Sequence, residues 1–297
     1  MKKLFAFAVS VLLACGLYAQ DAAQVAMPFS AIPRNVRTLS MGGISSGEDV
    51  AVRIFGEDKL DASLSWYSWA PSSAASNDIN ADVFARLGQR LGLSAQFALD
   101  NGPRYDIYSE TGVKGGFFVP KDMMFKLGAS YRILPSLSAG ATFRYMNSSL
   151  TSKVSYSAVA ADVMAAYDLG PARVAAGVTN LGTSVKAADG TAFGIPTAAT
   201  VAGDWSMTFA EKHSIDVKAQ IDWFFKGGLR AGAGAEYGFA DMAFLRVGYS
   251  YGGKSPFPSF LSLGVGGKFS GISINAAYLL GDKSIGGTLA LGAGYSF

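Results

Sequence analysis

The chain has 297 residues, of which 50% are hydrophobic and 16% charged, with 36 glycines, one cysteine and one histidine. A single cysteine and a single histidine exclude an internal disulfide and a Cys/His metal site, and we expect no metal or other cofactor. The formal net charge of +3 is small and spread along the chain, which argues against a nucleic-acid-binding surface.

Residues 1–19 have the pattern of an export signal. Two lysines precede an apolar run at Leu4–Ala14, which is too short to cross a bilayer as a helix. A small-residue site follows, so we expect cleavage after Ala19. A lipoprotein signal ending at Cys15 is the alternative, although the bulky Leu13 fits such a signal poorly.

Residues 20–60 contain no clear long strand. Pro28 and Pro33 interrupt the first part, and Met41-Gly42-Gly43 marks a turn. The segment nevertheless holds many apolar side chains that need to be buried. Its role therefore depends on the architecture of the residues that follow.

From residue 61 onward, apolar and polar residues alternate in block after block. Near residue 220, for example, Val217 and Ile221 fall on one face of a strand, whereas Lys218 and Asp222 fall on the other. A soluble sandwich would turn the apolar face inward, and a transmembrane barrel would turn it toward lipid. The expected strands are about 9–13 residues long, which matches a tilted membrane crossing. We therefore predict an all-β fold, a transmembrane antiparallel β-barrel.

We predict about fourteen strands, with residues 61–297 forming the barrel. The connections after even-numbered strands are short, and most of those after odd-numbered strands are longer. This asymmetry is typical of short periplasmic turns and longer outer loops. The predicted strands are 61–69, 81–88, 91–99, 123–133, 136–147, 157–168, 172–180, 198–209, 213–225, 229–239, 242–251, 259–269, 272–280 and 287–297.

The aromatic residues support this register, because amphipathic rings favour the two interfaces of a membrane. Tyr131 falls at a periplasmic strand end, and Trp223 falls toward an outer one. The last strand ends on Tyr295 and Phe297. A terminal Phe on an alternating strand resembles the signal that the barrel-assembly machinery reads. We therefore expect that machinery and outer-membrane lipid as partners.

Charged residues fall on the face that the barrel would turn toward its lumen. Cations and carboxylates are nearly balanced there, so we expect cross-strand ion pairs in a filled lumen rather than a selective ion path. The predicted lumen-facing charges are Lys126, Arg132, Arg144, Asp162, Asp216, Lys218, Asp222, Arg230, Glu236 and Arg246.

No arrangement of these residues favours an enzyme. His213 is the only histidine that could serve as a base, and it falls at a predicted periplasmic turn. Asp216 and Asp222 share a face, but about 20 Å of strand separates them. That distance is too large for two carboxylates that act on one bond. We therefore expect a protein without catalytic activity.

A fourteen-stranded barrel leaves a lumen that needs filling, since eight strands already enclose a packed interior. We expect residues 20–60, here called the hatch, to fold inward as a plug and to limit passage. Arg34 and Arg37 are expected to pair with lumen carboxylates such as Asp162 or Asp216. Solvation of both arginines in the periplasm is the alternative that the pattern leaves open.

Several short motifs in order resemble those of a known family. They are the segment 33–43 (PRNVRTLSMGG), Ala161-Asp162 with 178–182 (VTNLG), 194–197 (GIPT), and Ala235-Glu236-Tyr237 with 245–249 (LRVGY). In these motifs the chain is similar to the PorV/PorQ family of Bacteroidota outer-membrane proteins, within the superfamily of the long-chain fatty-acid transporter FadL. The hatch residues that the resemblance singles out are Arg34, Arg37, Met41, Gly42 and Gly43. The chain departs from the superfamily at 52–60, where the usual Asn-Pro-Ala element is missing.

The resemblance implies a fourteen-stranded barrel with an N-terminal hatch in the outer membrane of a Gram-negative bacterium. It also implies two kinds of function. The first is an accessory role in type IX protein secretion or surface attachment, with secretion-system proteins as partners. The alternative is FadL-like transport of hydrophobic small molecules, with a hydrophobic ligand. A passive, porin-like barrel is the third possibility.

Overall fold

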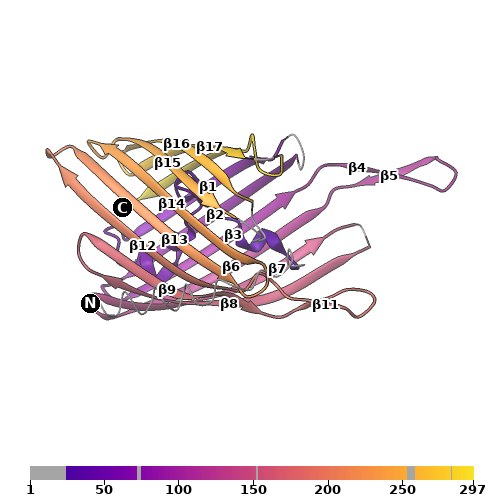
Figure 1. The fold of residues 1–297 in the computed structure, drawn as a ribbon, viewed down its shortest axis with the longest axis horizontal. Helices are drawn as coiled ribbons and strands as arrows, with labels where there is room; N and C mark the ends of the chain where they lie inside the picture. Colours follow the sequence, from indigo (N-terminus) through magenta and orange to yellow (C-terminus); the bar gives the residue numbers. More distant parts are fainter. Residues whose placement is uncertain (1–24, 72–74, 152, 253–257, 282) are drawn as a thin grey trace.

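The structure is a computed structural model that describes residues 25–71, 75–151, 153–252, 258–281 and 283–297. The predicted signal at 1–19, including Cys15, lies outside the described residues. Fourteen strands close into an antiparallel barrel in the order β1-β18-β17-β16-β15-β14-β13-β12-β9-β8-β7-β6-β3-β2 (Figure 1). The predicted fold class is therefore confirmed.

The barrel strands are β1 (Leu60–Trp69), β2 (Ser76–Leu87), β3 (Leu91–Asn101), β6 (Lys121–Leu134), β7 (Leu137–Ser149), β8 (Ser155–Asp168), β9 (Ala172–Gly182), β12 (Ala198–Phe209), β13 (His213–Phe224), β14 (Gly228–Phe239), β15 (Ala243–Tyr251), β16 (Phe260–Phe269), β17 (Ile272–Gly281) and β18 (Leu289–Ser296). Short turns join them at one end, called here the periplasmic end, and longer connections join most of them at the other, the outer end. Two further hairpins stand at the outer end: β4 (Tyr105–Tyr108) with β5 (Lys114–Phe118), and β10 (Val185–Lys186) with β11 (Ala192–Phe193). The β4–β5 hairpin projects well beyond the barrel (Figure 1).

Two predicted outer loops are shorter than expected. The sequence predicts a loop over 70–80, but β2 already begins at Ser76. The segment 100–122 contains the end of β3, the start of β6 and the β4–β5 hairpin. These strand ends are polar on both faces, so they lack the alternation on which the prediction rested.

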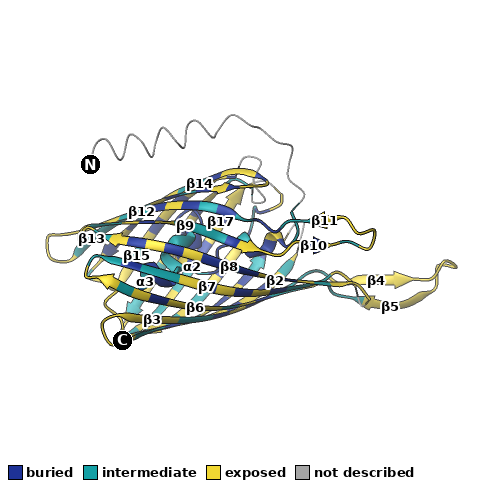
Figure 2. Cartoon of the chain, turned by 90° about the horizontal axis from the view of Figure 1, so that it is seen from below, coloured by how far each residue is buried: buried dark blue, intermediate teal, exposed yellow. Residues whose placement is uncertain are grey.

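Side chains alternate between the two faces of the wall, as the striped colouring in Figure 2 shows. Leu127, Val163 and Leu245 are exposed on the outside, whereas Gln96 and Thr142 are buried on the lumen side. A closed sheet leaves no unpaired strand edge, and an apolar exterior suits hydrocarbon. The protein is therefore an outer-membrane barrel of the Gram-negative type, as predicted.

Within the described ranges, no helix is long and apolar enough to span a membrane.

The described part of the hatch lies inside the barrel as four single helical turns. These are η1 (Pro28–Ala31), α2 (Val36–Leu39), η2 (Ser45–Glu48) and α3 (Val50–Arg53). Two of them are capped by side chains of the preceding residue: Asn35 accepts the N–H of Arg37 at 2.8 Å, and Asp49 accepts the N–H of Ala51 at 2.8 Å. The caps hold turns too short to be stable alone.

Candidate functional site: the plugged lumen

The turn at Gly42 packs backbone against backbone on the barrel wall. Gly42 has φ +80°, and a Cβ there would lie 2.7 Å from the carbonyl oxygens of Ala233 and Tyr249. On the wall, a Cβ on Gly234 or Gly248 would collide with the hatch backbone at Met41–Gly42. Gly264 makes room for the Ser40 side chain, because a Cβ on Gly264 would collide with the Cβ of Ser40. Only glycine permits an approach this close. Residues 36–54, here called the anchor, are therefore seated on a complementary surface.

The wall strengthens this seat with hydrogen bonds. The Ser262 hydroxyl accepts the N–H of Gly42 at 3.0 Å, and the Gln220 side chain accepts the N–H of Ser46 at 2.8 Å. Near the periplasmic end, the Ser138 hydroxyl donates to the carbonyl of Ala51 at 2.5 Å. The predicted hatch residue Met41 is buried in this contact.

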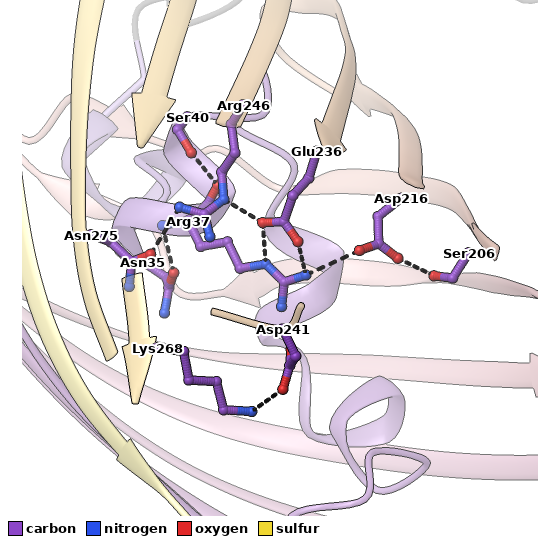
Figure 3. Close-up of polar contacts among 10 residues, drawn as sticks. All are labelled: Asn35, Arg37, Ser40, Ser206, Asp216, Glu236, Asp241, Arg246, Lys268 and Asn275. Carbon is purple, nitrogen blue, oxygen red and sulfur yellow. Dashed lines mark hydrogen bonds and ion pairs between the residues drawn. The ribbon is translucent and has the colours of Figure 1, made fainter. Parts of the chain in front are cut away.

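A network of ion pairs closes the periplasmic half of the lumen (Figure 3). Arg37 forms a two-point contact with Glu236, at 2.6 and 3.0 Å, and lies 3.5 Å from Asp216. Glu236 also receives Arg246 from the neighbouring strand, and Arg246 donates to Asn275 at 2.8 Å. Glu236, with a side chain 1% exposed, thus joins one hatch arginine to one wall arginine. The expected pairing of Arg37 with Asp216 is present, with Glu236 as the nearer partner.

A polar cavity of about 230 Å³ lies beside this network. Its lining includes Arg37, Asp216, Asp241 and Lys268, and the last two form an ion pair of 3.4 Å. Most of the lining side chains are charged or carry hydroxyl or amide groups, with Val36 and Phe244 among the few apolar ones, so the cavity suits water better than an apolar solute.

Arg34 holds the hatch at the outer end, with a partner that the sequence analysis did not identify. Its guanidinium contacts both carboxylate oxygens of Asp100, at 2.5 and 2.7 Å, and is 1% exposed. Its carbonyl accepts hydrogen bonds from Tyr67 and Asn80. The expected partner Asp162 binds Arg144 instead. The hatch runs down from the outer end, so Arg34 reaches β3 before it could reach either predicted carboxylate.

Three aspartates form a row on the wall around this arginine. Asp78, Asp100 and Asp122 are directly opposite one another on β2, β3 and β6. Like charges in such positions repel, and Arg34 supplies the positive charge between them. The row was not predicted because Asp78, Asp100 and Asp122 all fall in expected loops, just beyond the predicted strand ends. Their regular spacing, one aspartate at each outer strand end, is the signal that could have revealed it.

Apolar side chains of the hatch fill the outer half of the lumen. Met27 and Phe29 are buried in a chamber, here called the outer chamber, and a second apolar cluster packs Val36 and Leu39 against Tyr67 and neighbouring wall residues. The wall of the outer chamber consists of Ala98, Met124, Met146, Ala158, Ala160, Val185 and Ile195. The outer half of the lumen thus holds these two apolar clusters beside the Arg34–Asp100 pair, and smaller apolar clusters surround α3 toward the periplasmic end.

A cavity of about 80 Å³ separates these two halves. Ser30, Glu48, Lys126 and Asp162 are among its lining residues. A cavity that holds benzene measures about 150 Å³, and a water molecule takes up about 30 Å³. With the hatch seated, the lumen therefore has room here for water but not for an organic solute.

The remaining predicted charges also lie on the lumen side. Arg144 pairs with Asp162 across β7 and β8, and Arg230 pairs with Asp222 at 2.8 Å. Arg132 donates to the carbonyl of Ile54. Lys218 is directly opposite Asp204 on β12. Tyr295 and Phe297 are exposed on the outside at the periplasmic end, and their role in assembly stays a prediction.

Asp49 is the hatch carboxyl with the most altered acidity. Burial raises the pKa of Asp49 to about 6, and the N–H of Ala51 opposes that shift. Across the lumen, Asp162 raises the pKa further, while Arg144 and Lys126 lower it. The hatch therefore carries a group that titrates between acidic and neutral pH.

Comparison with solved structures shows the fold of known outer-membrane channels. The Pseudomonas putida toluene transporter TodX matches with a TM-score of 0.61 at 13% identity, over 90% of this chain and 99% of that one. The Ralstonia pickettii toluene transporter TbuX matches with a TM-score of 0.58 at 13% identity, over the same shares. A Pseudomonas aeruginosa FadL homologue matches with a TM-score of 0.50 at 10% identity, over 90% of this chain and 95% of that one.

A scan against models of protein families finds no match, and a search of curated proteins finds none either. The coarser part of the sequence resemblance, to FadL-like barrels, is therefore supported by fold. The finer resemblance to PorV/PorQ proteins finds no support in these comparisons. The similar structures are transport channels rather than enzymes, which agrees with the absence of a catalytic arrangement in the sequence.

Proposed function

We propose that this barrel passes small hydrophobic molecules across the outer membrane. The observation that carries the proposal is the outer chamber, in which Met27 and Phe29 occupy an apolar space at the outer half of the lumen. A solute with an apolar surface of similar size would bury that surface in the same place. Each buried methylene group contributes about 0.8 kcal/mol, so even a small hydrocarbon would gain from entering.

The part of the hatch that fills the chamber is held less closely than the rest. Residues 25–33, here called the arm, are joined to the wall by the backbone bond from Ala26 to Gly194, at 2.9 Å, and by two arginines that donate to its carbonyls. Arg34, which follows the arm, is held by its ion pair with Asp100. The anchor, by contrast, is seated on the glycine surface. The arm is therefore the part that must leave before a solute enters the chamber.

The comparisons favour this proposal over a role in protein secretion. TodX and TbuX are toluene transporters by name, and a FadL homologue shares the fold. The sequence resemblance alone favours a type IX secretion or surface-attachment role, with transport as the alternative. Transport comes first here because the named similar structures are transporters. The feature that fits the secretion alternative is the projecting β4–β5 hairpin, where Tyr105, Ile107 and Tyr108 are exposed. The class of solute, aromatic or long-chain, is left to experiment.

Uptake by intact cells tests the proposal. Cells that lack their own hydrocarbon channels would express either the wild-type barrel or the variant Met27→Ala/Phe29→Ala. Accumulation of labelled toluene and labelled palmitate would be followed over time. We expect faster uptake of at least one solute with the wild-type barrel than without it, and faster uptake again with the variant.

The variant Leu150→Ala, in an exposed outer loop, is the matched control and should behave as wild type. Uptake of both solutes at the rate of cells without the barrel would overturn the proposal.

A further inference from the structure

A row of polar side chains crosses the outside of the wall at the outer end. Asn101, Lys121, Ser149 and Ser155 are directly opposite one another on β3, β6, β7 and β8. Their positions alternate with those of lumen residues such as Asp122, so they point away from the lumen. Four neighbouring strands thus present one amide, one ammonium group and two hydroxyls on the membrane side.

The rows of residues nearer the membrane centre indicate the depth of the polar row in the membrane. Two residues further in, Met123 and Asn147 are directly opposite each other, and two residues beyond them Phe125 faces Tyr145. Aromatic rings gather where the hydrocarbon of the membrane ends, so we assign Phe125 and Tyr145 to the outer interface. A tilted strand rises about 10 Å over four residues. The polar row therefore stands at the level of lipid head groups rather than in the hydrocarbon or in free solution.

The base of the β4–β5 hairpin and the β7–β8 connection turn this row into a groove. Its volume is about 720 Å³. Lys121 and Lys153 supply two positive charges, and Phe117, Phe118 and Val154 supply apolar surface. Both lysines are exposed, and no ion pair is found for either one within the described residues.

We propose that this groove binds the phosphorylated head group of a glycolipid in the outer leaflet, of the lipid A type. Two ammonium groups beside hydroxyl and amide donors match the charge and the oxygen acceptors of a phosphate. The exposed apolar side chains below, Phe125 and Tyr145 among them, offer a path for an acyl chain along the wall. A membrane lipid fits this place better than a dissolved phosphate, because the groove opens on the lipid-facing side of the barrel.

Native mass spectrometry of the purified barrel tests this assignment. The protein in detergent would be incubated with diphosphoryl lipid A, or with the same lipid after enzymatic removal of its phosphates. We expect the wild type to retain the phosphorylated lipid preferentially. The variant Lys121→Gln/Lys153→Gln should retain roughly tenfold less of it.

The matched control is Lys59→Gln/Lys212→Gln, which removes two exposed lysines at the periplasmic end. It should retain the lipid as the wild type does. Equal retention of both lipids by the wild type would overturn the proposal, and so would undiminished retention by the groove variant. The wild-type comparison decides the question even if the groove variant fails to assemble.

Discussion

Arg34 and Asp100 face each other with both nitrogen–oxygen distances at or below 2.7 Å, although 66 positions separate them in the sequence. Arg34 stands where the arm meets the anchor. Asp100 belongs to the aspartate row of the wall. This ion pair therefore couples the seated position of the arm to the charge balance of the barrel, and its loss should favour departure of the arm.

The variant Arg34→Met tests that coupling. It would leave Asp100 between Asp78 and Asp122 without its positive partner, and breaking a buried pair in this way costs about 3–5 kcal/mol. We expect the arm to leave more often, with faster solute uptake and faster proteolysis near residue 30. The double variant Arg34→Met/Asp100→Asn should regain part of the lost stability. Equal behaviour of single and double variants would show that the charge is not the cause.

The glycine seat can be tested with one methyl group. In Gly248→Ala the new Cβ would collide with the backbone of Gly42, so the anchor should be displaced or the barrel should assemble poorly. Gly203→Ala on β12 is the control, because its Cβ would find its nearest neighbour at 3.7 Å. Protease protection of the hatch in assembled barrels is the measurement. A protected hatch in Gly248→Ala would contradict the backbone contact.

The raised pKa of Asp49 predicts that the equilibrium between the seated and the released hatch depends on pH. The seated hatch raises the pKa of Asp49 from 3.8 to about 6, so ionisation costs more there than in a released hatch. The resulting stabilisation is complete below about pH 4 and is lost as the pH rises through about 6. We expect more frequent channel openings in planar bilayers at pH 7.5 than at pH 5. In Asp49→Asn this difference should shrink, and an unchanged difference would assign it to other groups.

A charged side chain on the lipid-facing side of the wall should destabilise the barrel more, the closer it lies to the membrane midplane. Val217 is exposed on the outside in the middle of β13, whereas Phe225 lies just past its outer end. Arginine costs about 2–4 kcal/mol near the midplane and about 0–1 kcal/mol near an interface. Val217→Arg should therefore reduce the heat-modifiable, assembled fraction on gels much more than Phe225→Arg does. Equal assembly of both variants would contradict the assigned membrane position.

The strands of the wall could be predicted from sequence because their pattern depends on residues close together in the chain. Period-2 alternation sets which face each residue takes, and hairpin pairing then puts Asp222 opposite Arg230 and Glu236 opposite Arg246. Both ion pairs follow from register alone. The strand ends were harder, because the lumen near Asp78 and Asp122 is polar and the alternation stops there.

The path of the hatch could not be predicted in the same way. Apolar and polar residues of the hatch do not alternate with a regular period. The sequence therefore does not indicate whether Arg34 contacts β3 or β8. The fit of Gly42 onto Gly248 depends on strands more than 200 positions further along the chain. Such contacts arise only when the closed barrel presents its lumen surface to the hatch.

The central claim is that solute enters only when the arm leaves the outer chamber. Ala26 and Gly194 are neighbours, joined by a backbone hydrogen bond of 2.9 Å, so Ala26→Cys/Gly194→Cys is the pair to cross-link, with formation of the disulfide checked first by non-reducing electrophoresis. The only native cysteine of the sequence is Cys15, within the predicted signal. Uptake of labelled hydrophobic solute by cells with this variant should be slow under oxidising conditions and return to the wild-type rate after reduction. Equal uptake by the oxidised and reduced protein would contradict the account.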